Sequence, residues 1–326
     1  MDFSNIIGHE VIINNLKKAI KNNSISHSYL FEGPKLIGKR TVAKAFAKTL
    51  LCQKEGTEPC NTCASCIQFN SGNMPDFYIE SPEGQYFKKE QIDKIQKSMR
   101  RLPYEGKRKV YILENIDKMT QEAQNSFLKT LEEPPTYAVI IMTVVNSNSL
   151  LPTIISRCQL VRFSPIENNK IKDFIISKYE KTEEEASFTA SFSNGIIGKA
   201  IKICESEEFK QLREDVISII DNTINSEKFK IFSISEFFEK NKESIEDILD
   251  MIIIWFRDLL IMKETDNYSF IINRDKIQIL EQHSSKLSID KIYDIIERVK
   301  ETKDDIASKV NFQLAVEVML LEMQEV

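Results

Sequence analysis

The stretch Ser28-Tyr-Leu-Phe-Glu-Gly33-Pro-Lys-Leu-Ile-Gly38-Lys39-Arg40 contains the pattern that decides the fold. Its first five residues predict a short buried strand, and apolar residues at helical spacing from 41 to 51 predict a following helix. Between them, Gly33 to Lys39 matches most of the phosphate-binding motif G-x-x-x-x-G-K-[ST]. The glycines of such a loop let backbone N–H groups face a phosphate at the helix start.

The loop departs from this motif at its last position. Arg40 stands where a Ser or Thr hydroxyl should hold Mg²⁺, and Thr41 comes one residue late. On the loop alone, a glycine turn without a ligand and a nucleotide site are equally good interpretations. A nucleotide would be held, weakly, by four residues of the loop and the helix start: Gly33, Gly38, Lys39 and Thr41.

The strand expected at 110–113 departs from an active ATPase in a similar way. Such a strand normally ends in Asp-Glu, where the Asp helps to hold Mg²⁺ and the Glu polarises the attacking water. Here it is followed by Glu114 and Asn115. Because an amide cannot accept a proton at neutral pH, loop and strand together indicate a nucleotide fold whose hydrolytic parts are missing.

Working outward, strand-like and helical segments alternate up to about residue 165. Apolar, β-branched runs at 110–113 and 138–145 are separated by helical patterns, which is typical of an α/β domain with a parallel sheet. Helical periodicity dominates after Pro165, with a long apolar stripe from 245 to 260 that Ser244 and Asp247 are expected to cap. We therefore predict an α/β domain at 1–165, a small helical domain at 166–205 and a C-terminal helical bundle at 206–326.

Four of the six cysteines lie within 15 residues. Cys52, Cys60, Cys63 and Cys66 have the spacing C-x7-C-x2-C-x2-C, and two overlapping C-x2-C steps bring sulfurs close enough for a tetrahedral Zn²⁺. Four thiolates leave no open position on the metal, so a catalytic role is excluded. The spacing predicts a structural zinc module at 52–66.

Composition and charge limit the remaining possibilities. The chain of 326 residues is 42% hydrophobic and 29% charged, with a net charge of -5. This acidic balance argues against a protein that coats DNA without regard to sequence. Polar residues interrupt the first ten positions and no apolar run reaches 18 residues, so we expect a cytoplasmic protein with no membrane contact.

Several motifs carry a resemblance to one family. The chain resembles the bacterial DNA polymerase III clamp-loader subunits, and most closely their delta-prime type, over essentially its whole length. In chain order, the resemblance is carried by Ile7-Gly8-His9, His27-Ser-Tyr-Leu-Phe31, the four cysteines after the loop's helix, Leu128-Lys-Thr-Leu-Glu-Glu-Pro-Pro135, Ser156-Arg157-Cys158 and Asn311-Phe-Gln-Leu-Ala-Val-Glu317.

The resemblance implies an AAA+ domain with a zinc insertion, a helical lid and a C-terminal collar that joins other subunits. It also implies that Arg157, as the arginine of Ser-Arg-Cys, is a trans-acting arginine finger in the nucleotide site of a gamma/tau neighbour. A planar, permanently charged guanidinium suits this task because it offsets charge on the transferring phosphoryl group. Taken in isolation, Arg157 is better read as a surface arginine with a carboxylate partner.

The departures from an active ATPase are consistent with one another. Three substitutions each remove a group that an active ATPase subunit uses, at Arg40, Asn115 and Gly198. Gly198 aligns near the sensor-2 arginine of active subunits. The three substitutions imply a rigid stator with weak or absent ATP binding, working in a hetero-oligomer with gamma/tau and delta subunits on the sliding clamp and primed DNA. Nothing resembles a polymerase active site.

Two other hypotheses remain open. The chain could be an active motor like gamma/tau, with Thr41 and Glu114 compensating for the gaps, or a zinc-bearing DNA-binding module. Turnover by the isolated chain that depends on Lys39 favours the first, and tight, salt-sensitive DNA binding favours the second.

Overall fold

The structure, a computed structural model, describes residues 2–225, 231–265 and 267–324 and divides into two compact units. One unit comprises residues 1–171 and 194–199, and the other comprises residues 172–193 and 200–326. The boundary between them falls within two helices, α7 (Asn168–Tyr179) and α9 (Ile197–Glu205). The three-domain division expected from the sequence stays a prediction. Among the described helices, none is long and apolar enough to cross a membrane.

A five-stranded parallel sheet forms the centre of the first unit. The strand order is β2-β3-β4-β1-β5, so the strands expected at 110–113 and 138–145, β3 and β4, lie next to each other. β2 and β5, which the sequence patterns did not reveal, form the two edges. The strands are β1 (Ser28–Glu32), β2 (Phe77–Glu80), β3 (Lys109–Leu113), β4 (Ala138–Val144) and β5 (Gln159–Arg162).

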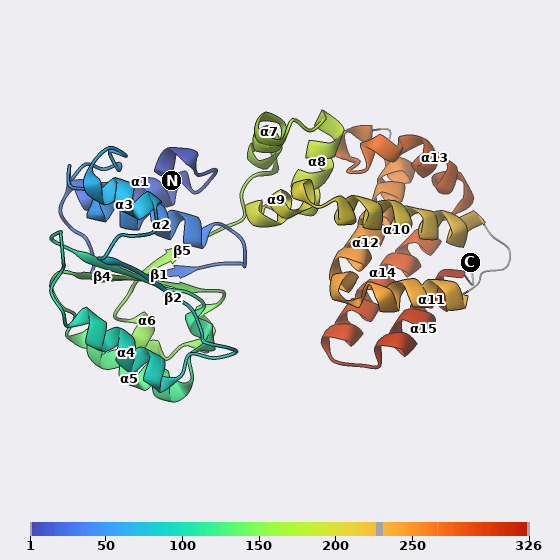
Figure 1. Cartoon of the computed structure of the whole chain (residues 1–326). Helices are drawn as coiled ribbons and strands as arrows, with labels where there is room; N and C mark the ends of the chain where they lie inside the picture. Colours follow the sequence, from blue (N-terminus) through green and yellow to red (C-terminus); the bar gives the residue numbers. More distant parts are fainter. Residues whose placement is uncertain (1, 226–230, 266, 325–326) are drawn as a thin grey trace. The chain divides into compact units, whose positions relative to one another are not determined.

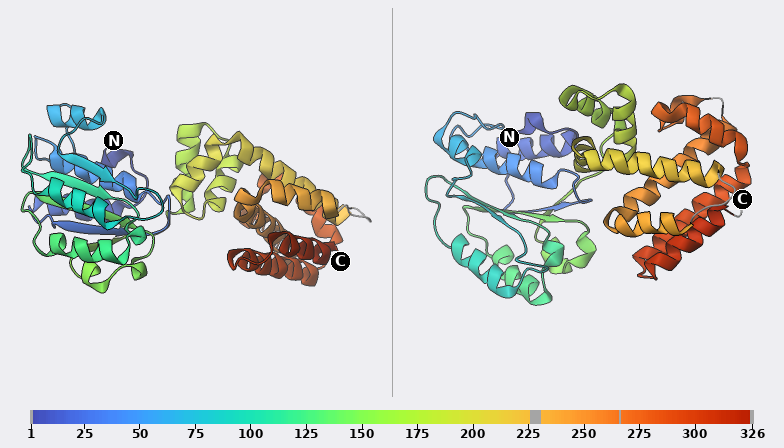
Figure 2. Two further views of the ribbon diagram at one scale, coloured as in Figure 1. Left: turned by 60° about the horizontal axis from the view of Figure 1, so that its bottom comes forward. Right: turned by 45° about the vertical axis from the view of Figure 1, so that its right-hand side comes forward.

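Both faces of this sheet are covered by helices (Figure 1). α1, α2 and α3 lie on one face and α4, α5 and α6 on the other, and two further views show the same layers (Figure 2). The side chains of each strand alternate between two separate cores: Tyr29 and Phe31 of β1 pack on the α2 side, and Leu30 packs on the α5 side. This double burial explains why the central strands read as continuous apolar runs.

The connecting helices agree with the periodicity of the sequence. The helix expected at 41–51 begins two residues earlier, at Lys39, and those expected at about 90–101 and 120–132 are α4 and α5. The bounds are α1 (Glu10–Lys21), α2 (Lys39–Leu51), α3 (Ala64–Asn70), α4 (Lys89–Met99), α5 (Gln121–Glu132) and α6 (Pro152–Ile155), with short 3₁₀ turns η1 (Phe3–Asn5), η2 (Ile116–Lys118) and η3 (Ser147–Ser149).

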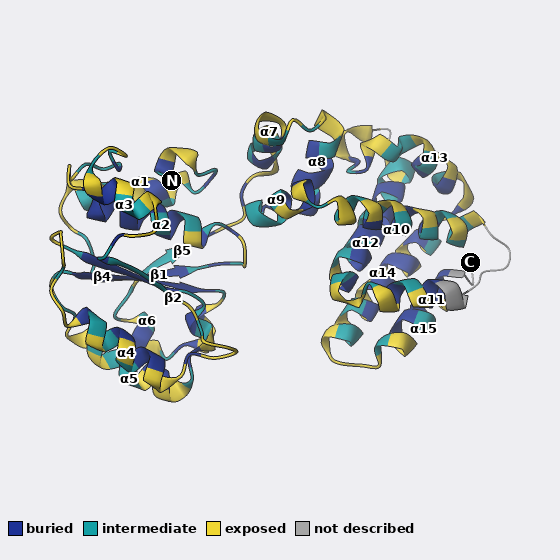
Figure 3. Ribbon diagram, viewed as in Figure 1, coloured by how far each residue is buried: buried dark blue, intermediate teal, exposed yellow. Residues whose placement is uncertain are grey.

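The second unit is helical in its described part. Its long central helix, α12, buries the apolar stripe predicted from the sequence, and Figure 3 shows this buried face among its neighbours. Trp255 is 1% exposed and donates a hydrogen bond to the buried His283, so it belongs to the core. The bounds are α8 (Glu183–Phe192), α10 (Glu207–Asn225), α11 (Ile231–Lys240), α12 (Ile245–Glu264), α13 (Ile277–Lys286), α14 (Ile289–Ala307) and α15 (Phe312–Gln324), with η4 (Lys242–Ser244), η5 (Tyr268–Phe270) and η6 (Arg274–Lys276).

One local expectation about α12 is wrong. Ser244 precedes the helix, but its side chain makes no capping hydrogen bond. The residue ends the 3₁₀ turn η4 with φ -104° and ψ 12°, whereas a capping side chain needs an extended backbone. By contrast, Ser288 has φ -77° and ψ 161° and accepts a hydrogen bond from Lys291 N at the start of α14.

Candidate functional site

The phosphate loop lies at the carboxyl-terminal ends of the parallel strands, between β1 and α2. Register pairing aligns Glu32 with Val144 of β4 and with Arg162 of β5, so these three strands end at the same edge. Gly33 follows directly, and a Cβ there would lie 2.7 Å from the carbonyl oxygen of Phe163. Gly38 has φ +110°, a conformation that side-chain-bearing residues rarely adopt. The local backbone therefore requires both glycines of the motif.

Lys39 is directed at the loop's own backbone. Its side chain is buried, and Nζ donates hydrogen bonds to the carbonyl oxygens of Gly33 at 2.5 Å and Pro34 at 2.8 Å. Burial lowers the pKa of the Lys39 amine to about 8, and the nearby charge of Asp117 opposes this effect. The amine that should meet a phosphate is thus bonded to carbonyl oxygens, which repel an anion.

Two substituted positions of the motif contact each other. Arg40 Nε lies 2.8 Å from Glu114 Oε1 in an ion pair, with the Glu114 side chain 13% exposed. These are the positions where an active ATPase carries the Mg²⁺ hydroxyl and the Mg²⁺ carboxylate. A guanidinium therefore neutralises the carboxylate that a metal ion would otherwise pair with. Thr41, half-buried in the first turn of α2, lies one residue beyond this pair.

Asn115 and Gly198 complete the surroundings of the loop. Asn115 takes a left-handed conformation at φ +57°, and its backbone N–H donates to Thr143 Oγ1. Gly198, at the start of α9, donates its N–H to the carbonyl oxygen of Leu36 at 3.0 Å. A Cβ on Gly198 would lie 2.7 Å from that same oxygen. The loop and the start of α9 are thus packed backbone against backbone.

Arg157 lies at the amino-terminal end of β1, opposite the end that carries the phosphate loop. It precedes β5, and its carbonyl oxygen accepts a hydrogen bond from the hydroxyl of Ser28, the first residue of β1. The phosphate loop follows the last residue of β1, so a strand of five residues, about 16 Å, separates the two. The structure therefore does not bring Arg157 and the loop of the same chain together.

The guanidinium of Arg157 is held by two close acceptors, and NH1 also donates to Ser156 Oγ at 3.5 Å. NH2 pairs with Glu132 Oε1 at 2.8 Å, and NH1 donates to the carbonyl oxygen of Thr153 at 2.9 Å. The Arg157 side chain is 35% exposed. The Glu132–Arg157 pair joins the Leu128–Pro135 and Ser156–Cys158 motifs, a contact that was not expected from the sequence.

The four cysteines form one cluster. Their sulfur atoms all lie within 4.8 Å of one another, and Cys52 Sγ is 4.0 Å from Cys63 Sγ. A tetrahedral Zn²⁺ with bonds of about 2.3 Å needs sulfurs about 3.8 Å apart, so the cluster fits with small adjustments. Backbone N–H groups also donate to three of the sulfurs: Cys60 N to Cys52, Cys63 N to Cys60 and Cys66 N to Cys63, at 3.3 to 3.4 Å.

The protonation chemistry of these thiols favours a bound cation. A hydrogen bond from Thr62 is the main cause that lowers the pKa of the Cys60 thiol to about 5. Burial raises the pKa of the Cys66 thiol to about 12. Because the Cys66 thiol resists ionisation and four thiolates repel one another, a set of four thiolates would need a nearby positive charge, which a metal ion could supply. The four residues could hold a metal ion, as the spacing predicted.

Several functional contacts were missed by sequence reasoning. His9 Nε2 lies 2.9 Å from the carbonyl oxygen of Ile37, so the Ile-Gly-His segment supports the phosphate loop. Glu132 was quoted only as part of a motif, although it contacts Arg157. An acidic residue in one family motif and an arginine in another were the available signal, but their sequence separation of 25 residues gave no sign of proximity.

Comparisons with known proteins agree along the chain. A family model described as DNA polymerase III, delta subunit, matches residues 8–167, and one described as DNA polymerase III, delta subunit, C terminal, matches residues 207–325. The DNA polymerase III subunit delta' of Bacillus subtilis (strain 168) is 33% identical over 313 residues, which cover 95% of this chain and 94% of that protein.

Two further similarities are more distant. The DNA polymerase III subunit tau of the same organism is 26% identical over 345 residues, covering 96% of this chain and 60% of that protein. Among solved structures, a variant of RuvB from Thermotoga maritima matches with a TM-score of 0.50 and 14% identity, covering 99% of this chain and 89% of that one. At this identity the second match bears on the fold alone, and it agrees with the AAA+ architecture.

Proposed function

The chain belongs to the delta-prime family of DNA polymerase III clamp-loader subunits, and on that premise we propose that it acts as a stator without ATPase activity. In this role it supplies Arg157 to the nucleotide site of a gamma/tau neighbour. The observation that carries the proposal is the Arg40–Glu114 ion pair, because it joins the two positions that an active subunit uses to hold Mg²⁺.

Two more contacts support the lack of turnover. Lys39 is bonded to loop carbonyl oxygens, and Gly198 stands where active subunits are expected to carry an arginine. A side chain at position 198 would collide with Leu36, so the site cannot accept that arginine without moving its backbone. We therefore propose that ATP binds weakly or not at all to Gly33, Gly38, Lys39 and Thr41.

The position of Arg157 supports action on a neighbour. Arg157 and the phosphate loop of the same chain lie at opposite ends of β1, and the Arg157 guanidinium is partly exposed. An arginine so placed can contribute to hydrolysis at a nucleotide bound by another subunit, where it offsets charge on the γ-phosphoryl group. The neighbour on this side would be a gamma/tau-type subunit.

The remaining parts are proposed to serve assembly in the cytoplasm. We assign structural zinc to Cys52, Cys60, Cys63 and Cys66, since four thiolates leave no position for a substrate. The residues from 206 onward would form the collar that joins gamma/tau and delta subunits. Leu314 is 56% exposed and Leu321 is 45% exposed on one face of α15, which suits such a contact. The assembly would place the sliding clamp on primed DNA.

The test combines the isolated chain with the reconstituted loader. The purified, zinc-loaded chain should show no ATP turnover above a Lys39→Ala control. In the loader, Arg157→Ala should lower ATP turnover and clamp loading by about 10³-fold at the site it serves. Turnover by the isolated chain that is lost in the Lys39→Ala variant would instead identify a motor subunit in which Thr41 and Glu114 compensate.

A further inference from the structure

Arg157 has an acidic partner whose role goes beyond surface charge. We propose that Glu132 is a positioning residue that holds the Arg157 guanidinium in one orientation before a neighbouring subunit docks. This inference rests on the proposed finger role of Arg157. Its starting observation is that Glu132 Oε1 and the Thr153 carbonyl oxygen bind different nitrogen atoms of the same guanidinium, at 2.8 and 2.9 Å.

The end of α5 fixes the backbone of Glu132. At the start of the helix Ala123 N donates a capping hydrogen bond to Thr120 Oγ1, and the helix packs through the buried Phe127 and Leu131. Glu132 is its last residue, and two prolines follow after Glu133. Proline restricts both its own φ and the residue before it, so the chain leaves the helix along a defined path. The carboxylate is thus carried by a rigid support.

The backbone of Arg157 is fixed as well. Its N–H donates to the carbonyl oxygen of Ile154 at 3.1 Å, and its own carbonyl oxygen accepts from Ser28 Oγ at 2.7 Å. With both backbones fixed, the remaining freedom lies in the long side chain of the arginine. Two acceptors on different elements, α5 and α6, restrict that freedom at the guanidinium itself. Ordering a long side chain lowers its conformational entropy, and without the two acceptors this loss would weaken docking of the neighbouring subunit.

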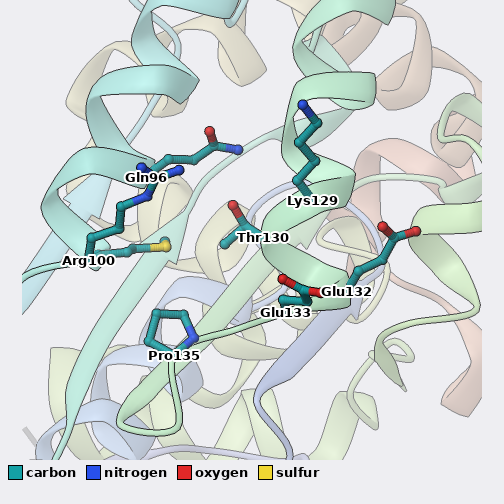
Figure 4. A pocket seen from close by; sticks show the side chains of 8 residues that line it. Gln96, Arg100, Lys129, Thr130, Glu132, Glu133 and Pro135 are labelled. Atoms are coloured by element: carbon teal, nitrogen blue, oxygen red, sulfur yellow. The ribbon is translucent and has the colours of Figure 1, made fainter.

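The surroundings of Glu132 direct its carboxylate toward Arg157. The residue lies at a pocket of about 430 Å³ between α4 and α5, which Gln96 and Arg100 line on the α4 side. Figure 4 shows that the carboxylate of Glu132 points away from these two side chains. In the described part of the chain, the cation found paired with Glu132 is Arg157, so the nearby Arg100 does not compete for it.

The pair leaves the guanidinium able to bind an anion. A guanidinium has five N–H donors, and the two short hydrogen bonds use one donor on each terminal nitrogen. NH1 also donates to Ser156 Oγ at 3.5 Å, and the remaining N–H groups are available to phosphate oxygens at the exposed part of the side chain. A positioning acceptor and an approaching phosphate can therefore be bound by different N–H groups of one fixed plane.

The experiment measures ATP turnover in the reconstituted loader with five forms of this chain: Glu132→Ala, Glu132→Gln, Arg157→Ala, the double variant Glu132→Ala/Arg157→Ala, and Glu133→Ala as the matched control. Glu133 is the adjacent exposed carboxylate, and no described ion pair joins it to Arg157. Thermal denaturation of each isolated chain checks that the fold is kept. The readout is kcat and KM for ATP, since the neighbour binds the nucleotide.

We expect Glu132→Ala to lower kcat about fivefold with KM for ATP unchanged, because an exposed ion pair has an effect of this size. Glu132→Gln keeps an acceptor oxygen and should restore most of the rate. The double variant should turn over as slowly as Arg157→Ala alone, and Glu133→Ala should match the unsubstituted chain.

The outcomes separate the two proposals. If Arg157→Ala slows turnover but Glu132→Ala does not, the finger role stands and the positioning role is wrong. The positioning role is also wrong if Glu132→Ala slows the Arg157→Ala variant further, since Glu132 would then act through another group. If Arg157→Ala has no effect, the finger assignment fails, and the role of Glu132 fails with it.

Discussion

The phosphate loop and the cysteine cluster are two binding motifs of the same unit, and they differ in where their polar groups point. In the loop, Lys39 is bonded to carbonyl oxygens and Arg40 to Glu114, so the groups that should meet a nucleotide have partners within the chain. In the cluster, four sulfurs converge within 4.8 Å of one another. The polar groups of the loop are engaged by internal contacts, whereas the four sulfurs of the cluster are close enough to hold a metal ion.

This difference shows that a motif and a binding site are separate properties. The loop keeps the glycines and lysine of its motif because the chain between β1 and α2 needs that backbone path. A nucleotide would additionally have to displace an ion pair and two hydrogen bonds. The cluster keeps all four of its ligands, and the like charges of thiolates make it unfavourable without a cation. Three experiments can sharpen or overturn this contrast.

The largest effect is expected at the cysteine cluster. Cys63→Ser should abolish binding of one Zn²⁺ per chain and lower the free energy of unfolding by about 3 kcal/mol or more. Cys63 is also the N-cap of α3, where its sulfur accepts from Cys66 N, but serine is a good cap, so the loss would come from the metal. Metal content and thermal denaturation measure the two effects.

The control for this experiment is Cys204→Ser. Cys204 is a buried cysteine of α9 outside the cluster, so its replacement should leave the metal content at one Zn²⁺ per chain. Absence of zinc from the unsubstituted chain, or unchanged stability after chelation, would contradict a metal-binding cluster, and full zinc occupancy in Cys63→Ser would show that Cys63 is not a ligand.

Local patterns predicted much of the fold and the cluster. Continuous apolar, β-branched runs made the central strands recognisable, and the spacing of the cysteines was enough to group them. The internal contacts of the loop were not predictable in this way, because Arg40–Glu114 and Gly198–Leu36 join residues from distant segments. The same holds for Glu132 and Arg157. Even a local signal failed at Ser244, where the preceding turn removed the extended backbone that a cap requires.

A second, smaller effect is expected where α9 meets the loop. Gly198→Ala places a Cβ 2.7 Å from the Leu36 carbonyl oxygen and 2.9 Å from the Leu36 Cβ, so backbone must move. Overpacking of this kind costs roughly 1–3 kcal/mol, and the better helix propensity of alanine returns about 1 kcal/mol. We expect a net loss of about 1.5 kcal/mol in the free energy of unfolding, measured by urea denaturation.

Gly106→Ala is the matched control for Gly198→Ala. A Cβ at Gly106 would have Arg108 N at 3.9 Å as its nearest neighbour, which is ordinary contact. This substitution should be neutral or slightly stabilising because alanine reduces the entropy of the unfolded chain. If the two variants have the same free energy of unfolding, α9 does not pack tightly on the loop. The contrast between the loop and the cysteine cluster would then be weaker.

The smallest effect is a pH dependence that arises from Lys39. Burial lowers the pKa of its amine to about 8 in the folded chain, while an unfolded lysine has a pKa of about 10.4. Between these values the unfolded chain binds more protons, so folding becomes more favourable as pH rises through this window, and the gain is complete above the unfolded pKa. The full shift corresponds to about 3 kcal/mol, but two carbonyl hydrogen bonds favour the charged amine, so we expect about 1 kcal/mol.

The measurement compares the unsubstituted chain with Lys39→Met by urea denaturation from pH 7 to pH 10.5. The difference in unfolding free energy should be constant below about pH 8 and then move in favour of the unsubstituted chain by about 1 kcal/mol. Lys35→Met, which removes an exposed lysine of the same loop, corrects for the loss of one charge. A flat difference for Lys39→Met would mean that the amine keeps its ordinary pKa, either because it is hydrated or because the carbonyl oxygens of Gly33 and Pro34 offset its burial. The closure of the loop would then rest on the Arg40–Glu114 ion pair, and the proposed lack of turnover on Arg40, Glu114 and Asn115 alone.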